Sequence, residues 1–114
     1  MHDEPMTYTS TAGQRDGTII LKLVGPLTLV NMFEFQNEFR EMKPQVLILD
    51  LSETPYMDSA GLGLIMNYYV SAQNNRRKLL LTGVNERIDA MMRMTKVHEI
   101  LIRFRSVEEA EATL

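Results

Sequence analysis

The feature that most constrains the fold of this chain is the segment at residues 46–51, which reads Val-Leu-Ile-Leu-Asp-Leu. Successive side chains of a strand point to opposite faces of its sheet, so a strand that is apolar at odd and even positions has no face suited to water. Such strands are typical of parallel sheets that helices cover on both faces. We therefore expect a central, buried strand here, with layers packed above and below it.

The segments on either side of this strand alternate between strand-like and helix-like patterns, with short connections between them. Stretches rich in β-branched residues or leucine predict further strands at residues 8–12, 18–24, 78–82 and 100–104. Apolar residues at helical spacing predict helices at residues 29–42, at residues 58–74, after Asn85 and after Ser106. Asn85 suits a helix N-cap, and Ser106 with Glu109 has the pattern of a capping box.

Each predicted helix has an apolar side that we expect to face the sheet. These inward residues are Met32, Phe35, Phe39 and Met42 in the first helix, Leu62, Ile65, Met66, Tyr69 and Ala72 in the second, Ile88, Met91 and Met92 in the third, and Val107, Ala110 and Leu114 in the last. Leu64 and Tyr68 form a second apolar seam on the second helix, four residues apart. Either a neighbouring helix covers that seam or a partner protein binds it.

The order of these elements is β-β-α-β-α-β-α-β-α, which predicts an α/β fold with a mixed sheet. The turn at residues 13–17 joins the first two strands into an antiparallel hairpin. Strands that are joined through helices run parallel, with right-handed crossovers. A chain of 114 residues has the length of about one domain. We therefore predict an N-terminal tail at residues 1–5 and one domain at residues 6–114.

Composition and charge argue against several classes of function. A formal charge of −3 and a pI near 5.3 disfavour a nucleic-acid-binding protein, which needs a basic face. There is no cysteine, and no histidine accompanies the carboxylates of Asp50, Glu53 and Asp58, so we expect no metal site and no cofactor. No apolar run approaches the ~20 residues that span a bilayer, and the N-terminus lacks the pattern of a signal sequence. We expect a soluble, cytoplasmic protein without membrane insertion.

Residues 52–63 carry the pattern with the clearest functional content. A short loop follows the buried strand, and a helix then starts at Asp58, with Ser59 in its first turn and two small residues, Ala60 and Gly61, behind it. The amide groups of a first turn have no acceptor within the helix, and the small residues leave room for a partner's backbone or a phosphate. From these residues alone, Ser59 is either an ordinary helix-start residue or a site of phosphorylation, since the positive end of a helix favours an anion.

These residues resemble a known family. Residues 47–52 and 58–63, which read Leu-Ile-Leu-Asp-Leu-Ser and Asp-Ser-Ala-Gly-Leu-Gly, are similar to the signature of the STAS domain (sulfate transporter and anti-sigma factor antagonist). Residues 25–28 (Gly-Pro-Leu-Thr), 79–83 (Leu-Leu-Leu-Thr-Gly) and 106–110 (Ser-Val-Glu-Glu-Ala) resemble further motifs of that family, in the same order. The resemblance extends over nearly the whole chain and implies a STAS-like mixed sheet.

The resemblance also implies a function. In bacterial members of the family, the serine that matches Ser59 is phosphorylated by an anti-sigma factor that is a serine kinase, and a phosphatase resets it. The chain is then expected to be an anti-sigma factor antagonist, not an enzyme, that binds the kinase while Ser59 is unphosphorylated and that is a monomer or dimer. The expected partner-binding residues are Pro26, Leu27, Thr28, Thr54, Tyr56, Met57, Asp58, Ala60, Gly61 and Leu64.

One departure from the family pattern leaves other functions open. Thr28 stands where many antagonists have an aspartate near the phosphorylated serine, which removes a like charge from that place. The alternatives are a structural STAS subunit of a stress-sensing assembly and an accessory subunit of a lipid-transport ABC system. A serine hydrolase is disfavoured, because the only histidines are His2 and His98 and the Gly-x-Ser-x-Gly elbow is absent.

Overall fold

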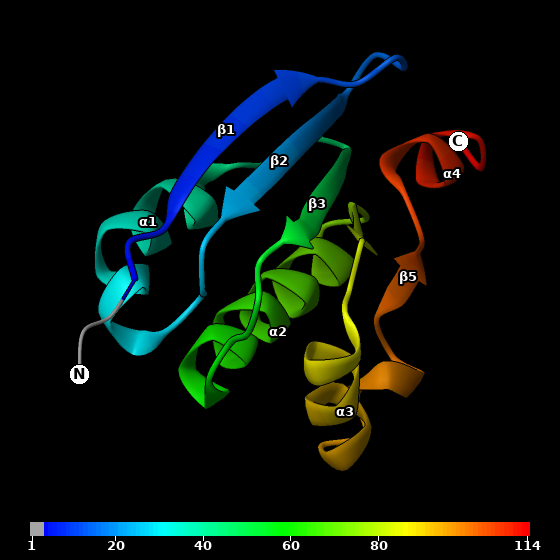
Figure 1. The fold of residues 1–114 in the computed structure, drawn as a ribbon. Helices are drawn as coiled ribbons and strands as arrows, with labels where there is room; N and C mark the ends of the chain where they lie inside the picture. Colours follow the sequence, from blue (N-terminus) through cyan, green and yellow to red (C-terminus); the bar gives the residue numbers. More distant parts are fainter. Residues whose placement is uncertain (1–3) are drawn as a thin grey trace.

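β3 (Val46–Glu53), the strand predicted from its apolar run, lies in the middle of a five-stranded sheet. The computed structural model describes residues 4–114, and its strands lie side by side in chain order, β1-β2-β3-β4-β5 (Figure 1). The other strands are β1 (Thr7–Ala12), β2 (Thr18–Val24), β4 (Lys78–Thr82) and β5 (Ile102–Phe104). β1 and β2 form the predicted antiparallel hairpin, and every later pair is parallel. The predicted mixed α/β sheet is confirmed.

Four α-helices follow the strands in the described part of the chain. They are α1 (Leu29–Glu41), α2 (Ser59–Asn74), α3 (Glu86–Met94) and α4 (Val107–Glu111). Each begins after a side chain that accepts a backbone N–H, and these N-caps are Thr28, Asp58, Asn85 and Ser106. In the last of them, Ser106 Oγ accepts the Glu109 N–H at 3.1 Å, and the Glu109 carboxylate accepts the Arg105 N–H at 3.2 Å. The predicted caps at Asn85 and Ser106 are therefore confirmed, although the return bond of the predicted capping box goes to the Arg105 N–H instead of the Ser106 N–H.

β5 is shorter than the strand predicted at residues 100–104. A 3₁₀ turn, η1 (Val97–Glu99), fills the connection after α3, and Lys96 enters it with a left-handed backbone at φ 65°. The N–H groups of Ile100 and Leu101 both donate to the Val97 carbonyl at 2.9 Å. These two residues close the turn instead of pairing with β4, so the strand begins only at Ile102.

The main core lies between one face of the sheet and the helices α1, α2 and α3. Phe35 and Phe39 of α1 are fully buried, as predicted, whereas Met32 and Met42 at the two ends of the same stripe are half-buried. The Phe39 ring stacks on the rings of Phe35 and Tyr68, with centroids 5.0 and 4.6 Å apart. Other buried helix residues of the predicted stripes are Leu62, Ile65, Ala72, Ile88 and Met92, and the half-buried ones are Met66, Tyr69 and Met91.

The second apolar seam of α2 is covered by the molecule itself. Leu64 and Tyr68 are both buried, and the Tyr68 hydroxyl donates to the Met42 carbonyl at the end of α1 at 2.8 Å. The guanidinium of Arg77 lies over the Tyr68 ring, 5.5 Å from its centroid. The interpretation of this seam as a partner-binding ridge is therefore wrong, and the interpretation as a helix-covered seam is confirmed.

The opposite face of the sheet carries a smaller core under α4. Val46, Ile48 and Leu80 from the strands form it together with Ala110, which is the only α4 residue that is fully buried. The two other predicted inward residues of this segment, Val107 and Leu114, are half-buried against the same core. The five residues of α4 cover little of the sheet, so most of the packing holds the three longer helices on the other face.

The predicted N-terminal tail, residues 1–5, lies mostly outside the described residues. Glu4 and Pro5 belong to neither a helix nor a strand, and the Asn31 side chain donates to the Glu4 carbonyl at 2.9 Å. The division of the chain into a tail and a domain stays a prediction. Between residues 4 and 114, no helix combines the length and the apolar character needed to cross a bilayer.

Candidate functional site

Three strand-to-helix loops meet at the carboxyl ends of the central parallel strands. They are the connections from β2 to α1, from β3 to α2 and from β4 to α3, and the helices α1 and α2 start at the same end of the molecule (Figure 1). Carboxyl ends of parallel strands are where open α/β sheets commonly place their binding sites. Ser59, the predicted site residue, is the first residue of α2 at this edge.

The first two of these loops are joined by their backbones. The Leu27 N–H donates to the Tyr56 carbonyl at 3.1 Å, and the Asp58 N–H donates to the Leu27 carbonyl at 3.2 Å. Together these bonds form an isolated parallel bridge between Leu27 and Met57. The Gly25 N–H adds a bond of 2.9 Å to the Glu53 carbonyl. The β3–α2 loop therefore continues the sheet pairing up to the residue before Asp58.

The carboxylate of Asp58 caps two helices at once. Its Oδ1 accepts the Gly61 N–H at 2.9 Å, which caps α2, and its Oδ2 accepts the Leu29 N–H at 2.9 Å, which lies at the first residue of α1. The N-cap of α1 itself, Thr28, accepts the Asn31 N–H through a longer bond of 3.4 Å. Asp58 thus holds the two helix starts together, and the predicted N-cap role of Asp58 is confirmed.

Gly61 is required by the close approach of the protein's own backbone. A Cβ atom at this position would lie 2.3 Å from the Leu27 carbonyl oxygen, which no side chain tolerates. Gly63, two residues further along α2 and exposed, would have nothing within 4 Å of an added Cβ. The expectation that Gly61 leaves room for a partner is therefore wrong, because the β2–α1 loop occupies that space.

The other side of the β3–α2 loop is held by the start of α3. The Asn85 side-chain amide donates to the carbonyls of Thr54 at 3.3 Å and Pro55 at 2.9 Å, while its oxygen accepts the Ile88 N–H at 2.8 Å. The Arg87 guanidinium lies 4.6 Å from the centroid of the Tyr56 ring. A loop that is held on both sides in this way has few alternative conformations.

Ser59 presents its side chain to solvent from this fixed frame. The residue is exposed, and it directly follows the Asp58 carboxylate in the first turn of α2. The N–H groups of Ser59 and Ala60 have no acceptor within the helix, so partial positive charge surrounds the hydroxyl. The predicted position of Ser59, accessible and at a helix start, is confirmed.

Most of the other predicted partner-binding residues do not reach the surface. The buried ones are Pro26, Leu27, Thr28, Thr54, Met57, Gly61 and Leu64, and the half-buried ones are Tyr56, Asp58 and Ala60. Thr54, for example, turns inward to donate its hydroxyl to the Leu23 carbonyl at 3.2 Å. The buried side chains position the Ser59 frame. The prediction that they form a contact surface therefore needs correction.

Three large apolar residues that were not predicted add to the surface near Ser59. Leu29, Val30 and Phe33, at the start of α1, are exposed by 51%, 56% and 63%. They are large apolar residues that fall outside the predicted inward stripe of that helix, and this was the signal available in the sequence. We call these three residues the α1 apolar surface.

The charged groups near the Ser59 edge include the Arg87 guanidinium over the Tyr56 ring, one ion pair and one carboxylate. Lys22 and Glu53 form an exposed ion pair of 2.5 Å on neighbouring strands, and the hydrogen bond to Glu53 raises the pKa of Lys22. No group of three or more metal-binding side chains occurs among residues 4–114. Asp58, which lies next to Ser59, is the only charged residue in the β3–α2 loop and the first turn of α2.

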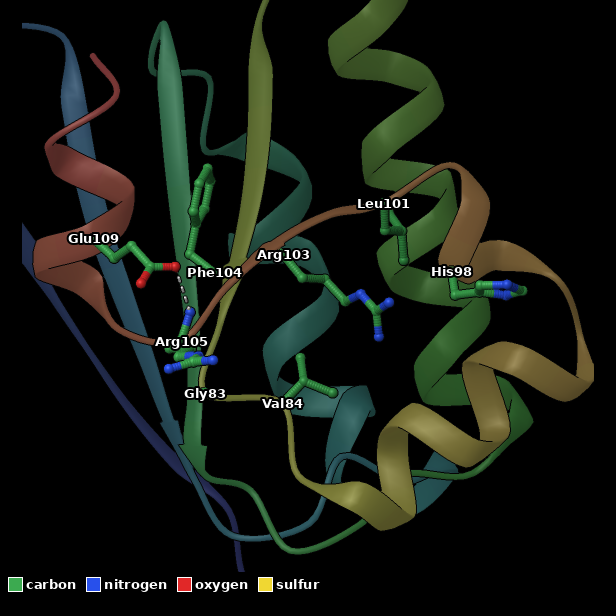
Figure 2. A pocket seen from close by; sticks show the side chains of 8 residues that line it. All are labelled: Gly83, Val84, His98, Leu101, Arg103, Phe104, Arg105 and Glu109. Carbon is green, nitrogen blue, oxygen red and sulfur yellow. Dashed lines mark hydrogen bonds between the residues drawn. The ribbon is translucent and has the colours of Figure 1, made fainter.

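A second concave region lies away from this edge, around β5. It is a hollow of about 620 Å³ lined by residues that include Gly83, His98, Arg103 and Arg105, and Figure 2 shows these side chains from close by. Arg103 is committed to an ion pair with Asp89 of α3, to which Arg93 also donates at 2.8 Å. The hydrogen bond from Arg93, which has the larger effect, and the one from Arg103 hold the pKa of Asp89 below its usual value. Ser59 does not line this hollow.

The sequence matches the STAS domain family over residues 10–110. An anti-sigma-B factor antagonist of Listeria monocytogenes is 35% identical over 63 residues, which are 55% of this chain and 54% of that protein. An anti-sigma-B factor antagonist of Staphylococcus aureus is 26% identical over 74 residues, 65% of this chain and 68% of that protein. The aligned part of this chain thus spans about half (54%) of the length of the Listeria relative.

Solved structures show the same fold. A candidate anti-sigma factor antagonist of Thermotoga maritima superposes with a TM-score of 0.84 at 22% identity, covering 93% of this chain and 92% of that one. One from Mycobacterium paratuberculosis gives 0.78 at 14% identity, covering 94% and 93%. The antagonist SpoIIAA in its unphosphorylated form gives 0.71 at 16% identity, covering 94% and 96%. At these identities the likeness establishes the arrangement of sheet and helices.

Proposed function

The chain belongs to the STAS domain family, and we propose that it is an anti-sigma factor antagonist that binds an anti-sigma factor kinase while Ser59 is unphosphorylated. The observation that carries the proposal is the exposed Ser59 side chain at the start of α2, in a frame of three bonded loops. The names of the curated relatives, anti-sigma-B factor antagonists, support the same function. The protein acts as a binding partner and as the substrate of that kinase.

Phosphorylation of Ser59 changes the charge of the docking face without rebuilding it. A phosphoserine adds about −1.5 to −2 charges, and the unpaired first-turn amides of α2 favour an anion at this place. The β3–α2 loop, which precedes Ser59, is bonded to the β2–α1 loop on one side and to Asn85 on the other, so the frame stays in place. The new charge lies next to the Asp58 carboxylate. The phosphate loses its bound water when a partner docks over it, and this desolvation costs free energy. A loss of about 100-fold in affinity, roughly 2.7 kcal/mol, is a reasonable size for that penalty.

The surroundings of Ser59 suit a phosphate acceptor, and the neighbouring Asp58 carboxylate is occupied by the N–H groups of Leu29 and Gly61. His98 lies on η1, with Nδ1 3.4 Å from the Met92 carbonyl, and it lines the hollow around β5. Within residues 4–114 no hydrogen bond joins a histidine to Ser59. The kinase therefore supplies the base and the nucleotide, and a phosphatase removes the phosphate. Such a cycle requires the protein to share the cytoplasm with ATP and both enzymes.

The proposal is tested by incubating the purified protein with the anti-sigma factor kinase of the same organism and ATP, and then locating phosphate by mass spectrometry. We expect a single phosphate on Ser59 and none on the Ser59→Ala variant. Ser52→Ala is the matched control, because Ser52 is an exposed serine at the end of β3, close to the same edge. Phosphate on another residue, or equal labelling of the Ser59→Ala variant, would refute the proposal.

A further inference from the structure

We propose that the α1 apolar surface, formed by Leu29, Val30 and Phe33, is the part of the docking face that supplies affinity, and that an uncharged apolar groove of the anti-sigma factor kinase covers it. This inference rests on the proposed function and extends it to a surface on α1. Its basis is the position, the exposure and the apolar character of these three side chains.

The three side chains lie on the side of α1 that faces away from the core. At about 100° per residue, positions 29, 30 and 33 fall within an arc of about 100°, opposite to the buried Phe35 and Phe39. Phe33 is exposed by 63%, more than either of the other two. Large apolar side chains gathered on one helix face and left uncovered mark an interaction surface more often than isolated ones do.

The apolar character is confined to the end of α1 that adjoins Ser59. The next positions on the same side of the helix are Asn37 and Arg40, which are exposed and polar. If the surface served general packing or a long helix partner, it would continue along α1. Its restriction to the first turns places it at the edge where the three loops meet.

A partner that covers Ser59 also reaches this surface. The Leu29 N–H and the Gly61 N–H share the Asp58 carboxylate, so the starts of α1 and α2 are joined through one side chain. Phe33 lies about 6 Å further along the axis of α1 than Leu29. A standard interface of about 800 Å² per partner corresponds to a disc of about 16 Å radius, which is wider than this separation.

The charge of the surface defines the chemistry of its occupant. The first turn of α1 contains no acidic residue, and its residues Leu29, Val30, Asn31 and Met32 are all uncharged. The exposed Glu34, one turn after Val30, borders the surface at its far end. An apolar, uncharged groove therefore complements this part, whereas the site for Ser59 on the same partner must accommodate a hydroxyl beside a carboxylate. Phe33 is the expected anchor, because aromatic residues in desolvated pockets dominate binding energy.

The experiment compares valine truncations on two helices. Val30 and Val70 are exposed by 56% and 51%, and Val70 lies on α2 outside the α1 apolar surface. We expect Val30→Ala to weaken binding to the anti-sigma factor kinase by about 5-fold and Phe33→Ala by more than about 10-fold, as measured by calorimetry. Val70→Ala should bind like the wild type. Urea unfolding of each variant checks that the fold is retained.

Three outcomes separate this inference from the proposed function. If Phe33→Ala and Val30→Ala bind like Val70→Ala while Ser59→Asp binds weakly, the inference on α1 is overturned and the proposed function stands. If the wild type does not bind the kinase at all, both are overturned. If the wild type dimerises in sedimentation experiments and Phe33→Ala abolishes the dimer without altering kinase binding, a second copy occupies the surface, and the inference is again overturned.

Discussion

The starts of α1 and α2 lie next to each other and share one carboxylate, yet they are built from opposite kinds of residue. α2 begins with the small or polar residues Ser59, Ala60 and Gly61, and its first turn packs against the β2–α1 loop. α1 begins with the large apolar residues Leu29 and Val30, which point away from the core. The same capping chemistry therefore supports two surfaces with different properties.

This difference assigns different tasks to the two helix starts. A surface that switches has to accept a new charge without moving, and α2 meets this requirement through short side chains and a clamped backbone. A surface that gives affinity has to bury apolar area, and α1 meets it with exposed branched and aromatic side chains. Asp58 joins the two, since its oxygens accept the Gly61 and Leu29 N–H groups at 2.9 Å each.

The largest effect on this arrangement is expected from Gly61→Ala. The added methyl group would lie 2.3 Å from the Leu27 carbonyl oxygen, so the two loops must separate. We expect a loss of about 2–3 kcal/mol in the free energy of unfolding, measured in urea. Gly63→Ala is the matched control on the same helix, where nothing lies within 4 Å, and it should stabilise the protein by up to about 1 kcal/mol. Equal effects of the two changes would contradict the close approach.

The next effect tests how much of the frame depends on Asp58. Asp58→Ala removes the acceptor for two backbone N–H groups, whereas Thr28→Ala removes one longer bond of 3.4 Å. We expect losses of about 2 kcal/mol and about 0.5 kcal/mol in the free energy of unfolding. Hydrogen exchange at Leu29 and Gly61 should accelerate together in the Asp58 variant. Faster exchange at Gly61 alone would show that Asp58 caps only α2.

The smallest effect is expected from Asp89, which pairs with Arg103 of β5, away from the two helix starts. Hydrogen bonds from Arg93 and Arg103 lower the pKa of Asp89 in the folded protein. A carboxylate with a depressed folded pKa stabilises the protein above its unfolded pKa of about 4, and this contribution disappears as the pH falls through the lower, folded value. We expect Asp89→Asn to flatten the loss of stability below about pH 4 without altering kinase binding at pH 7. An unchanged acid profile would refute this.

The sequence predicted much of this edge because its signals are local. The apolar run at residues 46–51 indicated the central strand, and Asp58, Asn85 and Ser106 were each predicted as caps from their neighbours alone. Ser59 in a first turn followed from the same local reasoning. Such features depend on a few consecutive residues, so they can be predicted without knowing the fold. The structure confirms them.

The features that the sequence could not show depend on residues far apart in the chain. The second bond of Asp58 goes to Leu29, 29 positions earlier, and the carbonyl that excludes a side chain at Gly61 belongs to Leu27. The burial of Thr54 depends on the Leu23 carbonyl across the sheet. The end of β2 and the loop after β3 meet only in the folded sheet, so their residues looked like a surface when they were considered singly.

The most direct test compares the affinity of the anti-sigma factor kinase for the unmodified protein and for the protein phosphorylated on Ser59, by calorimetry, with urea unfolding of both forms. We expect the phosphorylated form to bind about 100-fold more weakly while the two forms unfold at nearly the same urea concentration. Equal affinities would contradict the claim that an anion on Ser59 opposes docking. Weak binding that arises because the phosphorylated form is unfolded would contradict the claim that the frame remains intact.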